Sequence, residues 1–240
     1  MKTVELIPIF EDNYVFLISD PETAEALVVD PGEATAVVAV LTARNLRLIG
    51  ILTTHHHADH IGGAAELSQI FAAPVWAPRK NKDQIKADHY VSDNDFFELG
   101  GCGIQVLALP GHTLGHIAYW FSEKNWLFSG DVLFGLGCGR LFEGDFAQGF
   151  ESLQKIRQLP DATEIFCAHE YTEKNLQFCK TITYEASPRL ATYESDLTMR
   201  RLAGLPSVPL SLKVEKQFNP FLLAPTKEVF SNLRQKRNLF

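Results

Sequence analysis

The chain has 240 residues, of which 46% are hydrophobic and 21% charged, and its formal net charge at pH 7 is −7. This length and apolar content suffice to bury a substantial core, as one large domain or as one domain with a small appendage. No stretch approaches the roughly 20 apolar residues of a membrane span, and the negative charge argues against a nucleic-acid-binding surface, so neither partner is expected.

The first part of the chain alternates between predicted strands and predicted helices, with a hairpin expected at its start. The strands are expected at 4–10, 14–19, 26–29, 48–54, 74–77, 103–109, 117–122, 126–129 and 164–168. The helices are expected from a turn at 30–32 to about 43, then over 61–71 and 148–158. A loop-rich stretch is expected between 78 and 102.

The last part of the chain reads differently, because no strand is expected beyond Tyr171. Helices are expected over 174–183, 189–202 and 226–236, separated by prolines that cannot continue a helix.

The segment 54–60, Thr-His-His-His-Ala-Asp-His, follows a predicted buried strand and precedes a predicted helix. On extended backbone His55 and His57 point the same way, because side chains alternate with period two. Asp59 and His60 lie where the chain bends and aim at a neighbouring point. The segment therefore predicts ligands for one metal ion and for a second beside it. A solvated histidine-rich loop is the alternative, and a cloning tag is excluded by the internal position and apolar flanks.

Three further predicted strands end in residues of the metal-ligand type. His112 follows Pro110-Gly111, Asp131 follows Ser129-Gly130, and His169 ends the predicted strand at 164–168. One such residue at a strand end is usually a turn or cap residue. Four strands that all end this way predict an open metal site at one rim of a sheet. A nitrogen and oxygen ligand set without thiolate suits zinc and also admits iron or manganese.

The cysteines at 102, 138, 167 and 179 show neither a CxxC spacing nor the framework of a small secreted protein, so we expect reduced, mostly buried thiols. Acidic residues at positions 5, 11 and 12 interrupt any apolar signal-peptide region, which favours a cytoplasmic location. We expect a monomer.

Charge is unevenly distributed along the sequence. Residues 213–240 hold six lysines and arginines against two glutamates, a net charge of +4, which leaves −11 for residues 1–212. Cations near the end of a C-terminal helix complement its dipole. Alternatively, a basic patch receives an acidic small molecule, and charge alone does not separate these two interpretations.

The chain resembles the metallo-β-lactamase superfamily, and within it the hydroxyacylglutathione hydrolase, or glyoxalase II, family. The superfamily resemblance lies in the runs T-H-x-H-x-D-H, G-H-T-x-G-H and S-G-D and in the later strand-end histidine. The narrower resemblance rests on segments that span nearly the whole chain in the family's order. These segments are 12–14 (Asp-Asn-Tyr), 137–140 (Gly-Cys-Gly-Arg), 169–172 (His-Glu-Tyr-Thr), 219–221 (Asn-Pro-Phe) and 233–237 (Leu-Arg-Gln-Lys-Arg).

This resemblance implies an α+β fold, a four-layer αββα sandwich with a small C-terminal helical domain. The catalytic domain is expected at residues 1–170 and the helical substrate-binding domain at 171–240. It also implies two divalent metal ions, most simply zinc. His55, His57 and His112 would hold one ion, and a second set would hold the other, with Asp131 bridging the two. That second set is Asp59, His60 and His169.

The activity implied is hydrolysis of S-(2-hydroxyacyl)glutathione, chiefly S-D-lactoylglutathione, by a metal-bridging hydroxide. The products are glutathione and D-lactate, and the reaction is the second step of methylglyoxal detoxification. No catalytic residue separate from the metal ligands is needed, because the hydroxide attacks and the thiolate leaves without a strong general acid. Cys138 is the one candidate nucleophile, and we favour its being a thiol in a glycine-rich active-site loop.

The family's glutathione contacts map onto five residues of this sequence. They are Arg140, Phe142, Tyr171, Arg234 and Arg237. The family pattern commonly has Lys, Tyr and Lys at the first, second and last of these positions. Arginine keeps the charge and can clasp a carboxylate bidentately, whereas Phe142 lacks a hydroxyl. Asn175 could face the same groove, although an ordinary surface residue is the simpler expectation.

The remaining histidines are expected to play lesser parts: His56 as an outward or packing residue, His116 as a support for the ligands, and His89 as plain surface. Three other functions stay open. A glutathione persulfide dioxygenase of the same superfamily uses one iron, and it generally lacks the helical tail. A superfamily nuclease would need a phosphate-binding surface, against which the −11 of residues 1–212 argues. A non-catalytic metal-binding protein is the third.

Overall fold

The computed structural model describes residues 1–182 and 188–240, which fold around two six-stranded sheets. The first sheet has strands in the order β1 to β6, with antiparallel pairing up to β3 and parallel pairing beyond it. Its strands are β1 (Thr3–Ile9), β2 (Asn13–Asp20), β3 (Glu25–Val29), β4 (Arg47–Leu52), β5 (Val75–Pro78) and β6 (His89–Val91). The hairpin expected at the start of the chain is formed by β1 and β2.

The second sheet has the order β14-β13-β10-β9-β8-β7, and a separate hairpin follows β10. Its strands are β7 (Phe96–Leu99), β8 (Cys102–Ala108), β9 (Ile117–Phe121), β10 (Trp126–Gly130), β13 (Glu164–Cys167) and β14 (Leu210–Ser211). The hairpin pairs β11 (Leu133–Phe134) with β12 (Gly137–Cys138).

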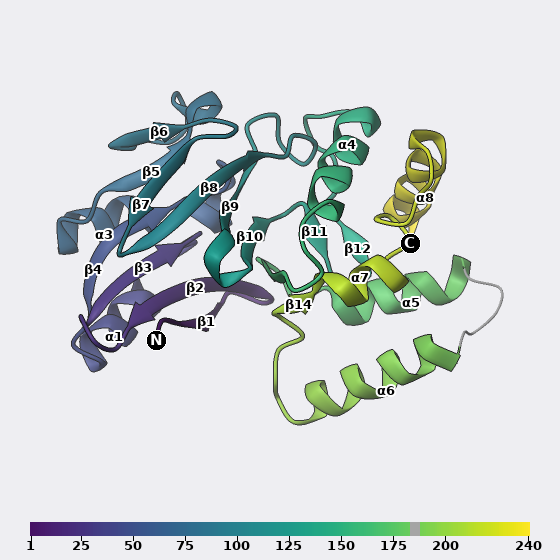
Figure 1. Cartoon of the computed structure of the whole chain (residues 1–240), viewed down its shortest axis with the longest axis horizontal. Helices are drawn as coiled ribbons and strands as arrows, with labels where there is room; N and C mark the ends of the chain where they lie inside the picture. The colour runs from purple at the N-terminus through teal and green to yellow at the C-terminus, as the bar shows by residue number, and fades with distance from the viewer. Residues whose placement is uncertain (183–187) are drawn as a thin grey trace.

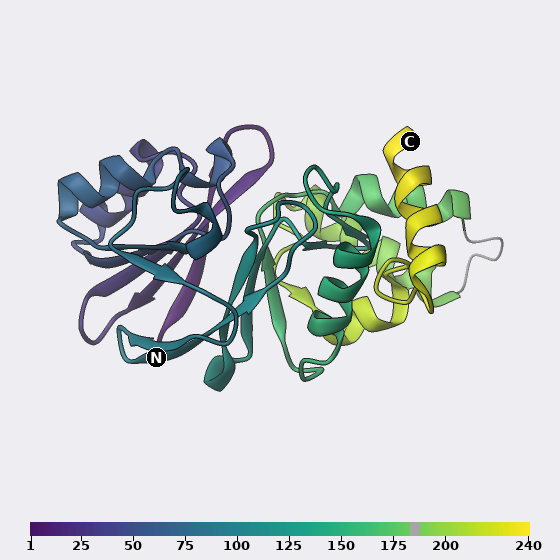
Figure 2. The same ribbon diagram turned by 90° about the horizontal axis from the view of Figure 1, so that it is seen from above.

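Helices cover the outer faces of both sheets (Figures 1 and 2). The α-helices are α1 (Thr35–Ala43), α2 (Ala58–Ile61), α3 (Ala64–Phe71), α4 (Phe146–Arg157), α5 (Thr172–Ile182), α6 (Pro188–Leu202), α7 (Leu212–Phe218) and α8 (Lys227–Leu239). Short 3-10 turns occupy Arg79–Asn81 and Ser122–Lys124. The helices α1 and α3 pack on the first sheet, and α4 and α8 lie beyond the second.

Strand β2 shows why the layers form. Its alternate residues Phe16 and Ile18 face the second sheet, while Val15 and Leu17 face α1 and α3. Because neighbouring side chains of a strand point to opposite faces, a strand buried on both sides must be apolar throughout. The expected four-layer αββα sandwich is therefore confirmed.

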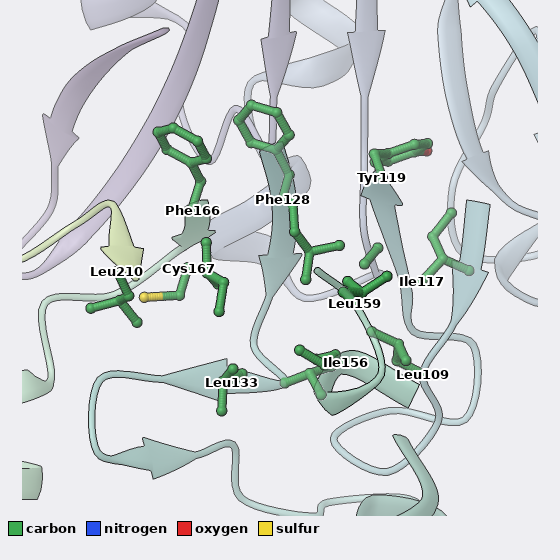
Figure 3. Close-up of a cluster of buried hydrophobic side chains, with 14 of the residues drawn as sticks. Leu109, Ile117, Tyr119, Phe128, Leu133, Ile156, Leu159, Phe166, Cys167 and Leu210 are labelled. Carbon is green, nitrogen blue, oxygen red and sulfur yellow. The ribbon is translucent and has the colours of Figure 1, made fainter. Parts of the chain in front are cut away.

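Aromatic side chains fill the space between the sheets. The rings of Phe128 and Phe166 stack at 4.9 Å, and Phe16 of the first sheet meets Phe128 edge-on at 5.5 Å. Figure 3 shows Phe128, Phe166 and Tyr119 on one side of the second sheet and Ile156 on the other. This packing makes a rigid base for the loops that leave the strands.

The predicted helix over 61–71 is interrupted, and this prediction was wrong in its start. Residues 58–61 form α2, and the chain bends at Gly62-Gly63 before α3 begins. A Cβ at Gly62 would lie 2.4 Å from the carbonyl oxygen of Gly32, so the close passage of the loop at 31–34 separates the two helices.

The expectation that no strand follows Tyr171 was also wrong. Strand β14 pairs antiparallel with β13, with Leu210 opposite Ile165. Its two residues follow two prolines and show no periodicity, so the pattern had read as a loop. Other short elements were not predicted either: β6 and β7 in the loop-rich stretch, the β11–β12 hairpin and the seven-residue α7.

The other expected elements are present within a few residues of the predicted bounds. The predicted end of the helix 174–183 at residue 183 lies outside the described residues. No helix in the described part of the chain is long and apolar enough to cross a membrane.

Candidate active site

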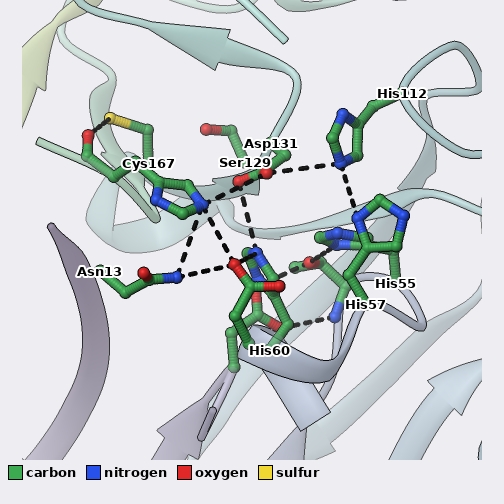
Figure 4. Close-up of polar contacts among 12 residues, drawn as sticks. Asn13, His55, His57, His60, His112, Ser129, Asp131 and Cys167 are labelled. Atoms are coloured by element: carbon green, nitrogen blue, oxygen red, sulfur yellow. Dashed lines mark hydrogen bonds and ion pairs between the residues drawn. The ribbon is translucent and has the colours of Figure 1, made fainter. Parts of the chain in front are cut away.

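The residues predicted as metal ligands come from loops that leave the two sheets at one rim. His55 follows β4, Asp131 follows β10 and His169 follows β13, while His112 lies between β8 and β9. Figure 4 shows the side chains of His55, His112 and Asp131 converging on a common centre. The structure brings together every predicted ligand: His55, His57, Asp59, His60, His112, Asp131 and His169.

The first ligand group consists of His55, His57 and His112, whose nearest ring nitrogens lie within 4.8 Å of one another. Nε2 of His112 is 3.0 Å from Nδ1 of His57. His57 has extended backbone angles and precedes the first turn of α2. His55 and His57 therefore point to the same place, as the period-two argument predicts.

The second group consists of Asp59, His60 and His169. Because Asp59 and His60 lie on α2, their side chains leave the chain in a different direction from those of the first group. Oδ2 of Asp59 is 3.5 Å from Nε2 of His60 and 3.5 Å from Nε2 of His169. One carboxylate and two imidazoles thus face one point.

Asp131 lies between the two groups. Its Oδ1 is 3.5 Å from Nε2 of His60, and its Oδ2 is 3.4 Å from Nε2 of His112 and 3.4 Å from Nε2 of His169. The carboxylate therefore reaches one histidine of the first group and both histidines of the second. This is the position that a bridging ligand requires.

Hydrogen bonds on the far side of each ring fix the tautomers of the histidines. Nδ1 of His60 donates to Asp30 at 3.0 Å, Nδ1 of His169 donates to Asp12 at 2.9 Å, and Nδ1 of His112 donates to the carbonyl of Arg140 at 2.8 Å. A carboxylate or carbonyl can only accept, so Nδ1 of each ring carries a proton and Nε2 faces the site.

His55 is oriented through a relay to the same carboxylate. The hydroxyl of Thr54 donates to Asp30 at 2.7 Å, so its oxygen is left to accept from Nδ1 of His55 at 3.0 Å. Asp30 also accepts from the Thr54 amide. Asp30, His55 and His60 form a third group of side chains that could hold a metal ion. Asp30 is instead bonded to His60 directly and to His55 through Thr54, so it orients these two histidines.

Buried polar atoms at the centre indicate that the site suits cations. Nε2 of His55, Nε2 of His60 and Oδ1 of Asp131 have no hydrogen-bond partner among the residues that the structure describes. A buried polar atom without a partner is costly, and a cation would satisfy all three. The donor set therefore fits metal ions.

The electrostatics lead to the same conclusion. Burial acts to lower the pKa of His60, but the carboxylates of Asp131 and Asp30 outweigh it and raise this pKa to about 10. Burial is likewise outweighed at His169, whose pKa Asp131 and two other carboxylates raise to about 11. Against its own burial, the pKa of Asp131 lies well below its usual range because of His60 and His169. The site attracts positive charge.

The other three histidines take positions close to those predicted. His116 accepts a hydrogen bond from the amide of Asp131 at 3.1 Å and stacks on His55, so it supports two ligands. His56 packs between Asn81 and Glu143, at 3.0 and 3.2 Å. His89 is exposed and stacks on a tryptophan.

Two glycines near the centre are required by close packing. A Cβ at Gly130, which has a φ of +49°, would lie 2.5 Å from Oγ1 of Thr54. A Cβ at Gly139 would lie 1.9 Å from the carbonyl oxygen of Asp131. Both loops therefore approach the ligands closely only because these residues lack side chains.

A cavity of about 290 Å³ adjoins the ligand cluster and shares His112 and Asp131 with it. All five predicted substrate contacts line it: Arg140, Phe142, Tyr171, Arg234 and Arg237. Its three arginines come from two distant parts of the sequence, the loop after β12 and helix α8. The cavity is thus a cationic recess that opens onto the predicted metal site.

The aromatic residues connect the cavity with the ligands. The ring of Tyr171 stacks on that of His169 at 4.7 Å. Phe142 is 61% exposed, and its ring lies 5.2 Å from that of His112 and 5.7 Å from that of His57. Phe142 therefore lies at the mouth, over the first ligand group.

Asn175 is 4% exposed and lines the cavity, so the expectation of a surface residue was wrong. It donates to the carbonyl of Gly135 at 3.0 Å and accepts from Nε of Arg237 at 3.2 Å. Arg234 is also buried and donates to the carbonyl of Cys138 at 2.6 Å. Cys138 is a buried residue of the cavity wall, and burial raises the pKa of its thiol.

Two acidic residues that support the site, Asp30 and Asp12, were not predicted as part of it. Asp30 directly follows β3 and precedes Pro-Gly, and it was interpreted as part of a turn, although the strand-end signal that found Asp131 applies equally to it. Asp12 lies in the β1–β2 turn and gave no signal beyond the resemblance.

The comparison with known families decides between the open functions. Residues 10–169 match the model of the metallo-β-lactamase superfamily, and residues 170–240 match the model of the hydroxyacylglutathione hydrolase C-terminus. A hydroxyacylglutathione hydrolase of Bdellovibrio bacteriovorus is 53% identical over 243 residues, which span 98% of this chain and 97% of that relative. This chain belongs to the hydroxyacylglutathione hydrolase family. The resemblance inferred from the sequence is confirmed.

Solved structures share the fold of this hydroxyacylglutathione hydrolase family member. The crystal structure of ETHE1 from Myxococcus xanthus matches with a TM-score of 0.71 and 25% identity, over 99% of this chain and 92% of that one. The structure of TTHA1623 in a di-iron-bound form matches with a TM-score of 0.59 and 26% identity, over 70% of this chain and 91% of that one.

Proposed function

We propose that this protein hydrolyses S-(2-hydroxyacyl)glutathione, chiefly S-D-lactoylglutathione, to glutathione and a 2-hydroxy acid, the second step of methylglyoxal detoxification. The observation that carries the proposal is a cationic cavity that opens directly onto a cluster of seven metal-type ligands, in a chain of the hydroxyacylglutathione hydrolase family. Glutathione carries two carboxylates, which arginines bind well.

Two divalent metal ions would be held at this cluster, most simply zinc, although the donor set also suits iron or manganese. His55, His57 and His112 would hold one, and Asp131 would contact both. Asp59, His60 and His169 would hold the second. Bound there, the two ions supply hydroxide at neutral pH and stabilise the developing oxyanion. The di-iron form of TTHA1623 supports a two-ion site on this fold.

The side chains of the cavity bind and orient the substrate. Arg140 and Arg237 would receive the glutathione carboxylates, while buried Arg234, bonded to Cys138, shapes the wall between them. Tyr171, stacked on His169, and Phe142 at the mouth would direct the thioester toward the ligand cluster.

No protein nucleophile or strong acid is required. The thiol that is the conjugate acid of the leaving thiolate has a pKa of about 8.5, so the thiolate departs without being protonated first. Cys138 is a poor nucleophile, since burial raises the pKa of its thiol. Asp30, Asp12 and the Arg140 carbonyl accept the Nδ1 protons and direct each Nε2 inward, where bound cations would take the place of a second proton.

We also propose the organisation and setting of the protein. Residues 1–170 would form the catalytic domain and residues 171–240 the helical substrate-binding domain. It would act as a cytoplasmic monomer without membrane or nucleic-acid partners. In support, no disulfide joins any of the four cysteines, and the net charge is −7.

The decisive experiment follows loss of the thioester absorbance of S-D-lactoylglutathione and measures metal content in parallel. We expect turnover with about two metal ions per chain. Oxygen uptake with glutathione persulfide at one iron per chain would instead identify a dioxygenase. Metal binding without any turnover would identify a non-catalytic protein.

Replacing Arg237 with alanine should mainly weaken substrate binding. A charge-assisted hydrogen bond is worth about 1.5–3 kcal/mol, so KM should rise by about tenfold to a hundredfold with little change in kcat. Lys236→Ala is the matched control, because this neighbouring cation is exposed and does not line the cavity. Equal KM values for the two variants would count against the proposed carboxylate site.

A further inference from the structure

The β11–β12 hairpin joins the predicted metal site to the substrate cavity. It begins two residues after Asp131 and ends two residues before Arg140, and its residues Phe134 and Cys138 line the cavity. Helix α7 lies beside this hairpin (Figure 1). None of the functions assigned above uses the polar residues of α7.

Two buried polar residues at α7 bind the hairpin backbone. Oε2 of Glu215 accepts from the amide of Leu136 at 2.8 Å. The Asn219 amide nitrogen lies 3.1 Å from the carbonyl oxygen of Phe134 and 3.0 Å from that of Gly137. Together they contact three of the four residues between Phe134 and Gly137.

Glu215 and Asn219 are also hydrogen-bonded to each other. The side-chain nitrogen of Asn219 donates to Oε2 of Glu215 at 2.9 Å. The same carboxylate oxygen therefore accepts hydrogen bonds from the Leu136 amide and from Asn219. Oδ1 of Asn219 accepts from the amides of Phe221 and Leu222, which fixes the orientation of its side chain. Glu215 is 1% exposed and Asn219 is fully buried.

A buried carboxyl is expensive, and its contacts must be specific for it to be tolerated. Burial raises the pKa of Glu215 to about 7, although the hydrogen bonds from Leu136 and Asn219 act to lower it. Among the described residues, the hydrogen bonds of its side chain go to the hairpin and to Asn219, and no basic side chain is bonded to it. An apolar residue would pack here at lower cost but would leave the Leu136 amide without an acceptor.

We propose that Glu215 and Asn219 are positioning residues, which hold the β11–β12 hairpin in the shape that lets Cys138 and Arg140 form part of the wall of the substrate cavity. This inference rests on the proposed function. Asp131 is held independently, because its amide donates to His116 at 3.1 Å and it directly follows β10. A displaced hairpin is therefore expected to disturb binding of the thioester first, while its effect on the ligand cluster is confined to His112, whose Nδ1 donates to the carbonyl of Arg140.

The test compares two replacements of nearly equal size. Glu215→Gln keeps an oxygen that can accept from both Leu136 and Asn219, whereas Glu215→Met keeps the length and removes the acceptor. We expect Glu215→Met to raise KM for S-D-lactoylglutathione about tenfold, with kcat within about threefold of the parent. Glu215→Gln should have the same KM as the parent.

Hydrogen exchange gives a second readout that is independent of turnover. The Leu136 amide should exchange faster in Glu215→Met, while amides of the central strand β9 stay protected. Asn219→Asp offers another route if Glu215→Met does not fold. The aspartate keeps the oxygen that accepts from the Phe221 amide, but it has a second oxygen in place of the nitrogen that donates to the hairpin carbonyls. Asn219→Asp should therefore also raise KM.

The outcomes separate this inference from the proposed function. Parent protein without thioester hydrolysis overturns the proposed function. Active parent protein, with KM and Leu136 exchange unchanged in both Glu215→Met and Asn219→Asp, overturns the positioning role. Loss of kcat at unchanged KM would also overturn it, because that is the signature of a smaller folded fraction.

Discussion

Replacing Asp131 with asparagine is expected to lower kcat about a thousandfold, equivalent to about 4 kcal/mol of transition-state stabilisation. The two side chains have nearly the same shape, so the loss reflects charge and ligand capacity. The Asp131 carboxylate faces histidines of both ligand groups, at 3.4 to 3.5 Å. An amide cannot bridge two cations with equal strength, because it offers one oxygen and no negative charge.

Steady-state kinetics and metal analysis check this prediction together. Metal content should fall below two ions per chain, and the far-UV circular dichroism should match that of the parent. Asp161→Asn is the control, since its side chain is 62% exposed and pairs with Lys216 away from the site. Activity of Asp131→Asn within tenfold of the parent would remove Asp131 from the bridging position.

Removing both metal ions with a chelator should abolish turnover and lower the Tm by about 20 °C. Each ion present at about a thousand times its Kd stabilises the native state by about 4 kcal/mol, so two ions contribute about 8 kcal/mol. In a domain of this size the Tm changes by about 2–4 °C for each kcal/mol. Without cations, Nε2 of His55 and Nε2 of His60 remain buried with no partner in the described structure. Adding back zinc, iron or manganese should restore both quantities.

Calorimetry and the thioester assay on the same chelated samples provide the measurement. A variant such as His57→Ala should already show a reduced Tm and little further change on chelation. Full activity in protein that contains less than about one-tenth of an ion per chain would contradict the metal-dependent account.

The sequence predicted the ligand cluster well because one local signal repeats. His55, Asp131 and His169 each follow an apolar strand, and strands of one sandwich bring their ends to one rim. The fold followed from period-two apolar runs and from the family resemblance. Asp30 also follows an apolar strand, but it was not predicted as part of the site. Pro-Gly comes next, and an aspartate before Pro-Gly is common in an ordinary turn.

The polar environment of the cavity could not be predicted from local patterns. The β11–β12 hairpin has two residues per strand, too few for periodicity to show. Glu215 and Asn175 appear on helices as ordinary polar residues, and only the tertiary structure buries them against the hairpin. Their partners lie 79 and 40 residues away in the chain, a separation that single-sequence patterns do not encode.

The backbone contacts between α7 and the hairpin have a consequence for transplanting specificity among metallo-β-lactamase scaffolds. A graft of residues 172–240 alone would carry Arg234 and Arg237 but leave behind the carbonyls of Phe134, Gly137 and Cys138 that the tail secures. The exchangeable module consists of two segments, the tail together with residues 131–142. Chimaeras that respect this pairing should inherit thiol-ester selectivity as a unit.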